Sequence, residues 1–194
     1  MADDALLLQI SWLGPFAWPG FENDSGLGSL PEDSGVYLQT YSYESGFLIY
    51  AAGLTRRPFR KRFAEHTRYY MSGDYTVLDP FAIAGGERRE VWHGWGWTPE
   101  KRIAFEQRAD EIRAAASKQL ASCRVFVAPI GTAARVLERL EAAIMVILYE
   151  QDEPFSSIPD RGMQISPRWP GEERIVVENS TPCEIHCLPR RFAI

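Results

Sequence analysis

Apolar and aromatic residues form two short runs in the first third of the chain. Val36–Tyr41 and Phe47–Ala52 are enriched in β-branched and aromatic side chains, which is typical of strands. The polar segment Ser42–Ser45 between them predicts a hairpin turn. In the register that this turn implies, Tyr37 lies opposite Tyr50, and directly opposed residues share one face of a sheet.

A helix is predicted from Pro58 to Met71, directly after the hairpin, because proline suits the first helical turn. Aromatic side chains recur along it at helical spacing: Phe59, Phe63, His66 and Tyr70. Arg62 precedes His66 by four residues, so one helix face carries both a guanidinium and an imidazole. A histidine on such a stripe is more often half-buried and structural than catalytic, so both interpretations of His66 stay open.

Two longer helices are predicted in the second half of the chain, on either side of a buried strand. The first begins after Thr98, whose side chain suits an N-cap, and continues to about Ser122. The apolar run Arg124–Pro129 predicts the strand. Gly131–Thr132 is predicted to cap the second helix, which ends near Tyr149.

One carboxylate of this second helix lies on its apolar side. Glu141 follows Leu137 by four residues and precedes Ile144 by three, so the three share a stripe. Burying a carboxylate is costly unless it is paired with a cation or bound to a metal. An internal ion pair with an arginine is the structural interpretation of Glu141, and a metal ligand is the functional one.

These elements predict a single α+β domain over residues 1–194, with a core at about 35–73 and 124–150. The additional segments are an N-terminal arm (1–34), an insertion (74–123) and a C-terminal extension (151–194). Further strands are predicted at Leu6–Trp12, Tyr75–Leu78, Arg89–Trp92, Ile175–Glu178 and Glu184–Leu188.

Aromatic residues are concentrated in the arm and in the insertion. The arm carries Trp12, Phe16, Trp18 and Phe21. These four are predicted to pin the arm to the domain surface, and a stacking platform for nucleic-acid bases is the alternative. Three tryptophans within residues 92–97 predict an insertion that packs on itself.

Charge is unevenly distributed along the chain. The formal net charge is −5, which counts against a protein that coats nucleic acid non-specifically. Five of the seven residues from 56 to 62 are nevertheless basic: Arg56, Arg57, Arg60, Lys61 and Arg62. This cluster predicts either a solvated helix face or a binding surface for a polyanion.

Cysteine usage and hydropathy indicate a cytoplasmic protein. The three cysteines are too few and too unevenly spaced for a disulfide framework. No apolar run approaches the length of a membrane span, and the acidic start MADDALLLQ does not resemble a secretory signal. Cys183-Glu-Ile-His186-Cys187 is a single knuckle, whereas structural zinc sites usually pair two, so zinc is not expected.

The hairpin, the basic helix and the later glutamate resemble the GIY-YIG nuclease superfamily. The resemblance rests on GVY at 35–37, a second strand that ends in YAAG at 50–53, the R-x-x-x-H spacing of Arg62 and His66, and Glu141 within LEAAIM. The family includes homing endonucleases, excision-repair incision subunits and some restriction enzymes. It implies a small three-stranded antiparallel sheet flanked by helices.

The resemblance also implies a role for each matching residue. Tyr37 would position or deprotonate the attacking water, with His66 as a proton-transfer group, and Tyr50 would help to orient the phosphate. Arg62 would stabilise charge on the phosphorane, and Glu141 would hold Mg²⁺ or Mn²⁺. The implied activity is metal-dependent hydrolysis of DNA, with RNA as an alternative substrate and Arg56, Arg57, Arg60 and Lys61 as substrate-binding residues.

Departures from the family pattern leave a second interpretation open. YAAG is one residue longer than Tyr-Ile-Gly, so Ala51 occupies the tyrosine position if Gly53 sets the alignment. The spacing from Gly53 to Arg62 is also one residue longer than expected, which suggests a β-bulge. Pro154 is followed by Phe-Ser-Ser, where many members have an asparagine. The alternative function is a weakly active or inactive module of this fold that binds nucleic acid or protein.

Overall fold

The computed structural model describes residues 6–194, so the first five residues of the predicted arm lie outside the described part. The helices are α1 (Glu22–Ser25), α2 (Phe59–Met71), α3 (Pro80–Ala84), α4 (Pro99–Ser122) and α5 (Ala134–Tyr149). The strands are β1 (Leu6–Ser11), β2 (Leu13–Ala17), β3 (Gly35–Tyr43), β4 (Gly46–Thr55), β5 (Val77–Leu78), β6 (Glu90–Trp92), β7 (Arg124–Pro129), β8 (Ile175–Ser180) and β9 (Arg191–Ala193).

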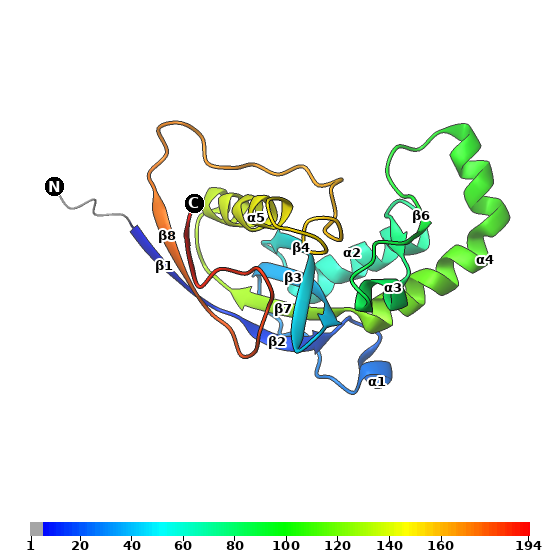
Figure 1. The fold of residues 1–194 in the computed structure, drawn as a ribbon, viewed down its shortest axis with the longest axis horizontal. Helices are drawn as coiled ribbons and strands as arrows, with labels where there is room; N and C mark the ends of the chain where they lie inside the picture. The colour runs from blue at the N-terminus through cyan, green and yellow to red at the C-terminus, as the bar shows by residue number, and fades with distance from the viewer. Residues whose placement is uncertain (1–5) are drawn as a thin grey trace.

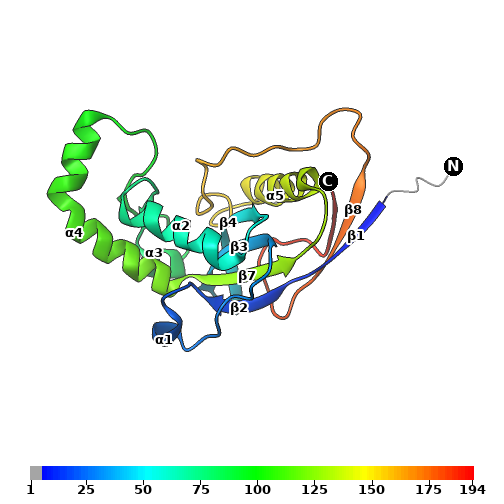
Figure 2. The ribbon, with the colours of Figure 1, turned by 180° about the vertical axis from the view of Figure 1, so that it is seen from behind.

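A four-stranded antiparallel sheet with the order β2-β7-β3-β4 forms the centre of the molecule. α2 and the insertion, which includes α4, lie on one side of this sheet (Figures 1 and 2). α5 lies on the other side, where β1, β8 and β9 form a second sheet (Figures 1 and 2). Each side has its own cluster of buried apolar side chains. The predicted α+β class is therefore confirmed.

The β3–β4 hairpin is longer and tighter than predicted. β3 extends to Tyr43 and β4 begins at Gly46, so the turn is Glu44–Ser45 rather than Ser42–Ser45. Glu44 adopts a positive φ of 49°, which suits so short a turn. The predicted register was wrong, because Tyr37 lies opposite Gly53 instead of Tyr50.

A β-bulge in β4 explains the difference in register. Gln39 pairs with Ala51 and the next residue of β3, Thr40, pairs with Ile49, so Tyr50 is the extra residue. The bulge therefore lies within YAAG and not in the segment between Gly53 and the helix, where it had been predicted.

Helix predictions were accurate in their extent and less so in their caps. α2 ends at Met71, and its predicted aromatic stripe is buried. The Thr98 hydroxyl accepts a hydrogen bond from the Lys101 backbone N–H at 3.2 Å, as expected of an N-cap. α5 instead begins after Ala133, with no side-chain cap, so the predicted Gly131–Thr132 cap was wrong.

Aromatic residues of the arm and the insertion are parts of the core. Trp18 is fully buried against Phe63 of α2, and Trp12 is buried in the cluster on the α5 side. This burial removes both tryptophans from any stacking platform for bases. Trp92 belongs to the same buried cluster as Trp18 and also packs against Phe105 of α4. The insertion therefore packs on itself, as predicted, and on the core as well.

The C-terminal extension returns to the N-terminal arm. β8 runs parallel to β1 over six paired residues, and β9 is antiparallel to β8. The predicted strand at Glu184–Leu188 was wrong, because Ile185 forms only an isolated bridge to Phe47. Over residues 6–194, no helix is both long and apolar enough to span a membrane.

Candidate functional site

A cavity of about 620 Å³ opens beside β4, the strand at the edge of the central sheet. α2 and α5, which lie on opposite sides of the sheet (Figure 1), both contribute side chains to it. The five catalytic residues predicted from the sequence all line this cavity: Tyr37, Tyr50, Arg62, His66 and Glu141. The fold thus brings together residues from β3, β4, α2 and α5.

Tyr37 is at the centre of a hydrogen-bonded group. Its hydroxyl oxygen lies 2.7 Å from Nε2 of His66, and Nε of Arg62 donates to the same oxygen at 3.4 Å. Arg62 can only donate, so the Tyr37 proton is available to His66, which then carries its own proton on Nδ1. Burial raises the pKa of Tyr37 to about 12, although Arg62 opposes the rise, so the phenol is neutral at pH 7.

His66 is held as a neutral imidazole. Its side chain is 5% exposed, and burial together with the nearby Arg62 charge lowers its pKa to about 3. The rings of Trp18, Phe63 and Tyr75 lie within 6.2 Å of it, measured between centroids. Among the described residues, Nδ1 of His66 has no hydrogen-bond partner. This environment suits an acceptor that orients Tyr37 better than a group that stores a proton.

Gly53 is required by the position of Tyr37. A Cβ atom at residue 53 would overlap the end of the Tyr37 ring, at Cζ, Cε2 and the hydroxyl oxygen. The glycine of YAAG therefore gives the Tyr37 hydroxyl the space in which it meets His66.

Tyr50 lines the cavity but its ring is buried. Its side chain is 3% exposed and packs against Tyr41, with 6.1 Å between ring centroids. Burial raises its pKa well above the usual value, and the charge of Asp160 adds to the rise, whereas a hydrogen bond with Tyr70 opposes it. The Tyr50 hydroxyl thus belongs to a buried group on the Asp160 side of the cavity.

Glu141 lines the cavity from α5, whereas Arg62 lines it from α2, on the other side of the central sheet (Figure 1). Burial raises its pKa to about 7, the charge of Glu138 adds to this, and Arg62 and the Leu54 backbone N–H oppose it. Arg62 forms its ion pair with Glu65, at 3.4 Å. Glu141 is therefore a half-buried carboxylate that senses Arg62 without being paired to it, which differs from the internal ion pair considered above.

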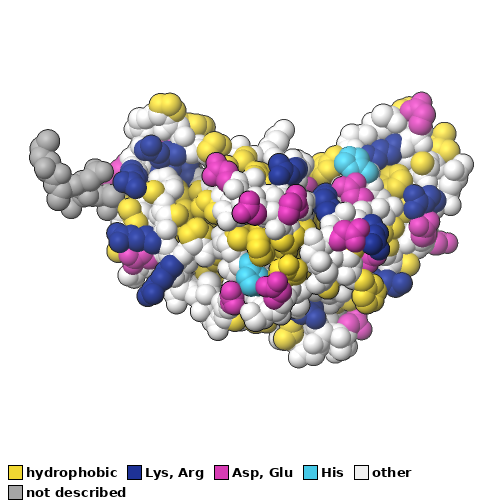
Figure 3. All heavy atoms as spheres, in the orientation of Figure 1, with side chains coloured by type: hydrophobic (Ala, Val, Ile, Leu, Met, Phe, Trp, Pro, Cys, Tyr) yellow, Lys and Arg dark blue, Asp and Glu magenta, His cyan; other side chains and the backbone are white. Residues whose placement is uncertain are grey.

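The four predicted substrate-binding cations are all exposed. Arg57 is bound by Glu65 in a bidentate ion pair, with N–O distances of 2.7 and 2.8 Å. Glu65 thus neutralises part of the basic cluster around Arg56, Arg60 and Lys61. Figure 3 shows both acidic and basic side chains on the visible face, with neither sign covering the whole of it.

The cavity also has a wall that the sequence did not identify. Tyr75 and Trp95 come from the insertion, and Asp160 and Gly162 come from the C-terminal extension. Gly162 lies directly against the Trp95 indole, where a Cβ atom would collide. The Asp160 backbone N–H donates to the Tyr50 carbonyl at 2.8 Å, so this wall also covers part of the β4 edge. In the sequence, the cluster of tryptophans at 92–97 was the one sign that the insertion is packed, and it did not indicate this cavity.

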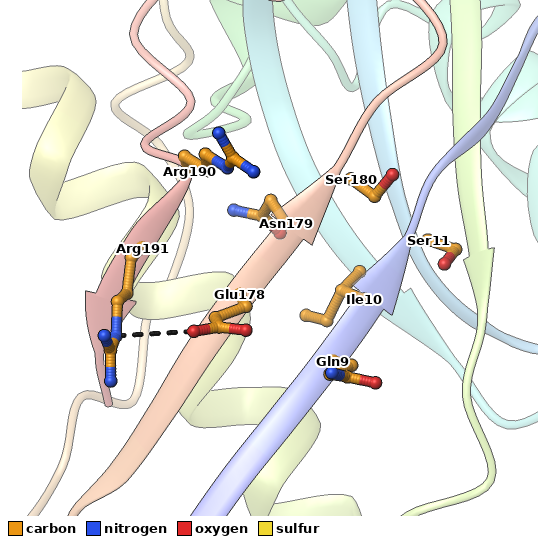
Figure 4. Close-up of a pocket in the computed structure, with 8 residues that line it drawn as sticks. All are labelled: Gln9, Ile10, Ser11, Glu178, Asn179, Ser180, Arg190 and Arg191. Carbon is orange, nitrogen blue, oxygen red and sulfur yellow. Dashed lines mark ion pairs between the residues drawn. The ribbon is translucent and has the colours of Figure 1, made fainter.

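A second cavity, of about 590 Å³, lies on the outer sheet (Figure 4). It is lined by side chains of β1, β8 and the segment entering β9, including Asn179 and Arg190. Arg191 and Glu178 form an ion pair across it at 3.6 Å. None of the five predicted catalytic residues lies there, so we place the candidate site in the cavity beside β4.

The chain matches no protein-family model, no curated protein and no solved structure.

Proposed function

We propose that this chain is a metal-dependent endonuclease that hydrolyses phosphodiester bonds in DNA by water attack. The observation that carries the proposal is the convergence of Tyr37, Arg62, His66 and Glu141 on one cavity from separate elements. Together they offer a polarised hydroxyl, a fixed cation and a carboxylate, which are the groups that phosphodiester cleavage uses.

The arrangement of the core supports the same proposal. β7, β3 and β4 form an antiparallel three-stranded unit, with α2 following the hairpin and α5 following β7. This order and pairing are compatible with a GIY-YIG-like core, to which β2 adds a fourth strand. The insertion and the two terminal extensions surround that core.

Arg62 is the phosphate-binding residue of the proposed mechanism. Its side chain is 30% exposed, so it can reach a ligand in the cavity. The neighbouring Tyr37 hydroxyl helps to raise its pKa, although burial opposes this, so its charge is permanent. Its guanidinium would bind the non-bridging oxygens and stabilise the charge that grows on them.

Tyr37 would orient the attacking water. The Tyr37 side chain is 2% exposed but lines the cavity. Its oxygen would accept a hydrogen bond from a water bound there, while its own proton points to His66. Because the pKa of Tyr37 is about 12 and that of His66 about 3, neither is ionised at pH 7 in the free protein. We therefore assign His66 to positioning the Tyr37 hydroxyl, and Tyr37 to direct contact with the water.

The carboxylates of the cavity fit a hard divalent cation. Within residues 6–194, Glu141 is half-buried and forms no ion pair with an arginine, and Glu138, one turn before it, lines the same cavity. Oxygen donors of this kind suit Mg²⁺ or Mn²⁺, which keep several water ligands. Bound there, the ion would supply Lewis-acid stabilisation of phosphate charge. Residues 6–194 contain no group of three or more metal-ligating side chains, so one or two carboxylates would hold it.

The proposal is tested by incubating the protein with duplex, nicked and branched DNA in Mg²⁺ or Mn²⁺. We expect cleavage by the wild type, and a loss of at least about 100-fold in Glu141→Ala and Arg62→Ala, as for removal of one preorganised group. Glu150→Ala, at an exposed residue just after α5, is the matched control and should retain activity. Equal inertness of the wild type and Glu141→Ala on every substrate would refute the enzyme assignment.

A non-enzymatic binding module is the second candidate function. It is favoured by the exposed cations Arg56, Arg60 and Lys61, which lie outside the cavity. This function predicts salt-dependent DNA binding that survives Arg62→Ala and disappears when Arg56, Arg57 and Arg60 are replaced together by alanine. Lack of DNA binding at any salt concentration would point instead to an assembly role.

A further inference from the structure

Three tyrosines besides Tyr37 line the candidate site: Tyr50, Tyr70 and Tyr75. Tyr70 is 2% exposed, so the comparison is between Tyr50 and Tyr75. Tyr50 is 3% exposed and belongs to a buried group with Tyr41 and Tyr70. Tyr75 is half-buried, and its ring centroid lies 5.7 Å from that of His66, the partner of Tyr37. Tyr75 therefore exposes more of its side chain than Tyr50 does.

Tyr75 and Arg62 line the same cavity, and the charge of Arg62 acts on the Tyr75 hydroxyl. Burial raises the pKa of Tyr75, and among the surrounding charges Arg62 has the largest effect and opposes this rise. For Tyr50 the corresponding charges are Asp160, which adds to the rise, and Arg88, which opposes it. Asp160 also raises the pKa of Tyr75, so both hydroxyls are close to this carboxylate. The difference is the cation, which is Arg62 for Tyr75 and Arg88 for Tyr50.

Tyr75 is rigidly held. Its ring lies 5.2 Å from each of Tyr69, Tyr70 and Trp95, measured between centroids. Its backbone N–H donates to the Tyr69 carbonyl at 3.3 Å. Gly94 packs so closely on the Tyr75 backbone that a Cβ atom would collide with it. A hydroxyl fixed in this way loses little conformational entropy when it binds a ligand.

We propose that Tyr75, a residue of the insertion, supplies the second phenolic hydroxyl that contacts the phosphate bound at Arg62, and that Tyr50 supports the sheet instead. This inference rests on the proposed function, because it names a further substrate-binding residue of the same site. It assigns the insertion a direct part in substrate binding. As a neutral donor, the hydroxyl would bind a non-bridging phosphate oxygen without adding negative charge to the site.

The test compares Tyr75→Phe with Tyr50→Phe, since each substitution removes one hydroxyl and keeps the ring. A hydrogen bond to a charged group contributes about 1.5–3 kcal/mol, so Tyr75→Phe should lower kcat/KM for DNA cleavage by about 10- to 100-fold. Tyr50→Phe should lower it by less than about threefold at a temperature where both variants are folded. Thermal unfolding of each variant establishes that temperature.

Binding of the dinucleotide pTpT gives a second measurement that does not require cleavage. With ¹³C-labelled tyrosine in the wild type, we expect the Tyr75 ring signals to shift on titration and the Tyr50 signals to stay in place. Tyr75→Phe should weaken the pTpT affinity about tenfold or more. This measurement remains informative even if a variant proves too unstable to assay.

The outcomes separate this inference from the proposed function. Loss of cleavage in Arg62→Ala and Glu141→Ala would support the nuclease proposal. If Tyr75→Phe is then fully active and Tyr50→Phe has lost activity, the Tyr75 assignment is wrong and the nuclease proposal stands. If pTpT binds and shifts Tyr75 but no substrate is cleaved, the Tyr75 contact holds and the nuclease proposal fails. If the wild type neither cleaves DNA nor binds pTpT, both are overturned.

Discussion

Replacing Gly53 by alanine tests the geometry on which the candidate site depends. The φ of Gly53 lies outside the left-handed region, so the backbone can accept an alanine without strain. The new Cβ atom would instead overlap the end of the Tyr37 ring on the neighbouring strand. Tyr37 is 2% exposed and packs against Phe63 and His66, so its ring has little room to move away.

The cost can be estimated from these contacts. Overpacking of a buried site costs about 1–3 kcal/mol. Displacing the Tyr37 ring also breaks its 2.7 Å hydrogen bond to His66, which leaves buried polar groups unpaired at a cost of about 1–3 kcal/mol. Alanine recovers about 0.5–1 kcal/mol because it is less flexible than glycine in the unfolded chain. The expected net loss of unfolding free energy is therefore about 1–5.5 kcal/mol.

Urea unfolding followed by tryptophan fluorescence measures this loss. Gly131→Ala is the matched control, because a Cβ atom at residue 131 meets open space, and it should leave stability within about 1 kcal/mol of wild type. A double-mutant cycle with Tyr37→Ala isolates the collision. Once the ring is removed, Gly53→Ala should cost almost nothing, so the two losses should be strongly non-additive. Additive losses, or a Gly53→Ala variant as stable as the control, would refute the proposed contact.

Three further predictions follow from buried titratable groups. Burial raises the pKa of Glu141 to about 7 from 4.5, so in this range the folded state retains a proton that the unfolded chain releases. The free energy of unfolding should therefore fall as the pH rises from about 4.5 to 7. In Glu141→Gln, the urea midpoint should change less over this range. Burial lowers the pKa of His66 to about 3 from 6.5, so stability should also fall as the pH drops from about 6.5 towards 3, and His66→Asn should weaken that fall. Burial raises the pKa of Cys123 to about 12, whereas Cys183 and Cys187 are half-buried. At pH 8, iodoacetamide should therefore modify Cys183 and Cys187 in the folded protein and should modify Cys123 only after urea has unfolded it. Mass spectrometry counts the modified thiols.

The hairpin, α2 and α5 could be predicted from the sequence because each depends on a local pattern. The register of the hairpin could not. Residues 35–41 of β3 are all buried, so apolar and polar positions do not alternate along it, and no pattern distinguishes one register from its neighbour. The bulge at Tyr50 depends on how two apolar strands fit together, which is a property of the packed sheet.

The residues of the candidate site also fall into those that a local pattern predicted and those that it did not. Tyr37, Arg62 and Glu141 were identified because their residue types suit a recognisable chemistry at a regular spacing. Tyr75 and Asp160 were missed because they reach the cavity through an insertion and a terminal extension, whose paths are set by long-range packing. The segment at Glu184–Leu188 failed for a related reason. Its composition suits a strand, but only Ile185 finds a partner on β4.

The parallel pairing of β1 with β8 has a consequence for how the protein is made. Leu6 at the start of β1 pairs with Ile175 at the start of β8, so this contact joins distant parts of the sequence. During synthesis β1 leaves the ribosome before β8, so its leucines remain without their partner strand while the central sheet is being translated. Contacts this distant form slowly. Closure of the outer sheet is therefore expected to be the last event of folding, and a nascent chain stalled before β8 would expose an unpaired, leucine-rich strand to aggregation.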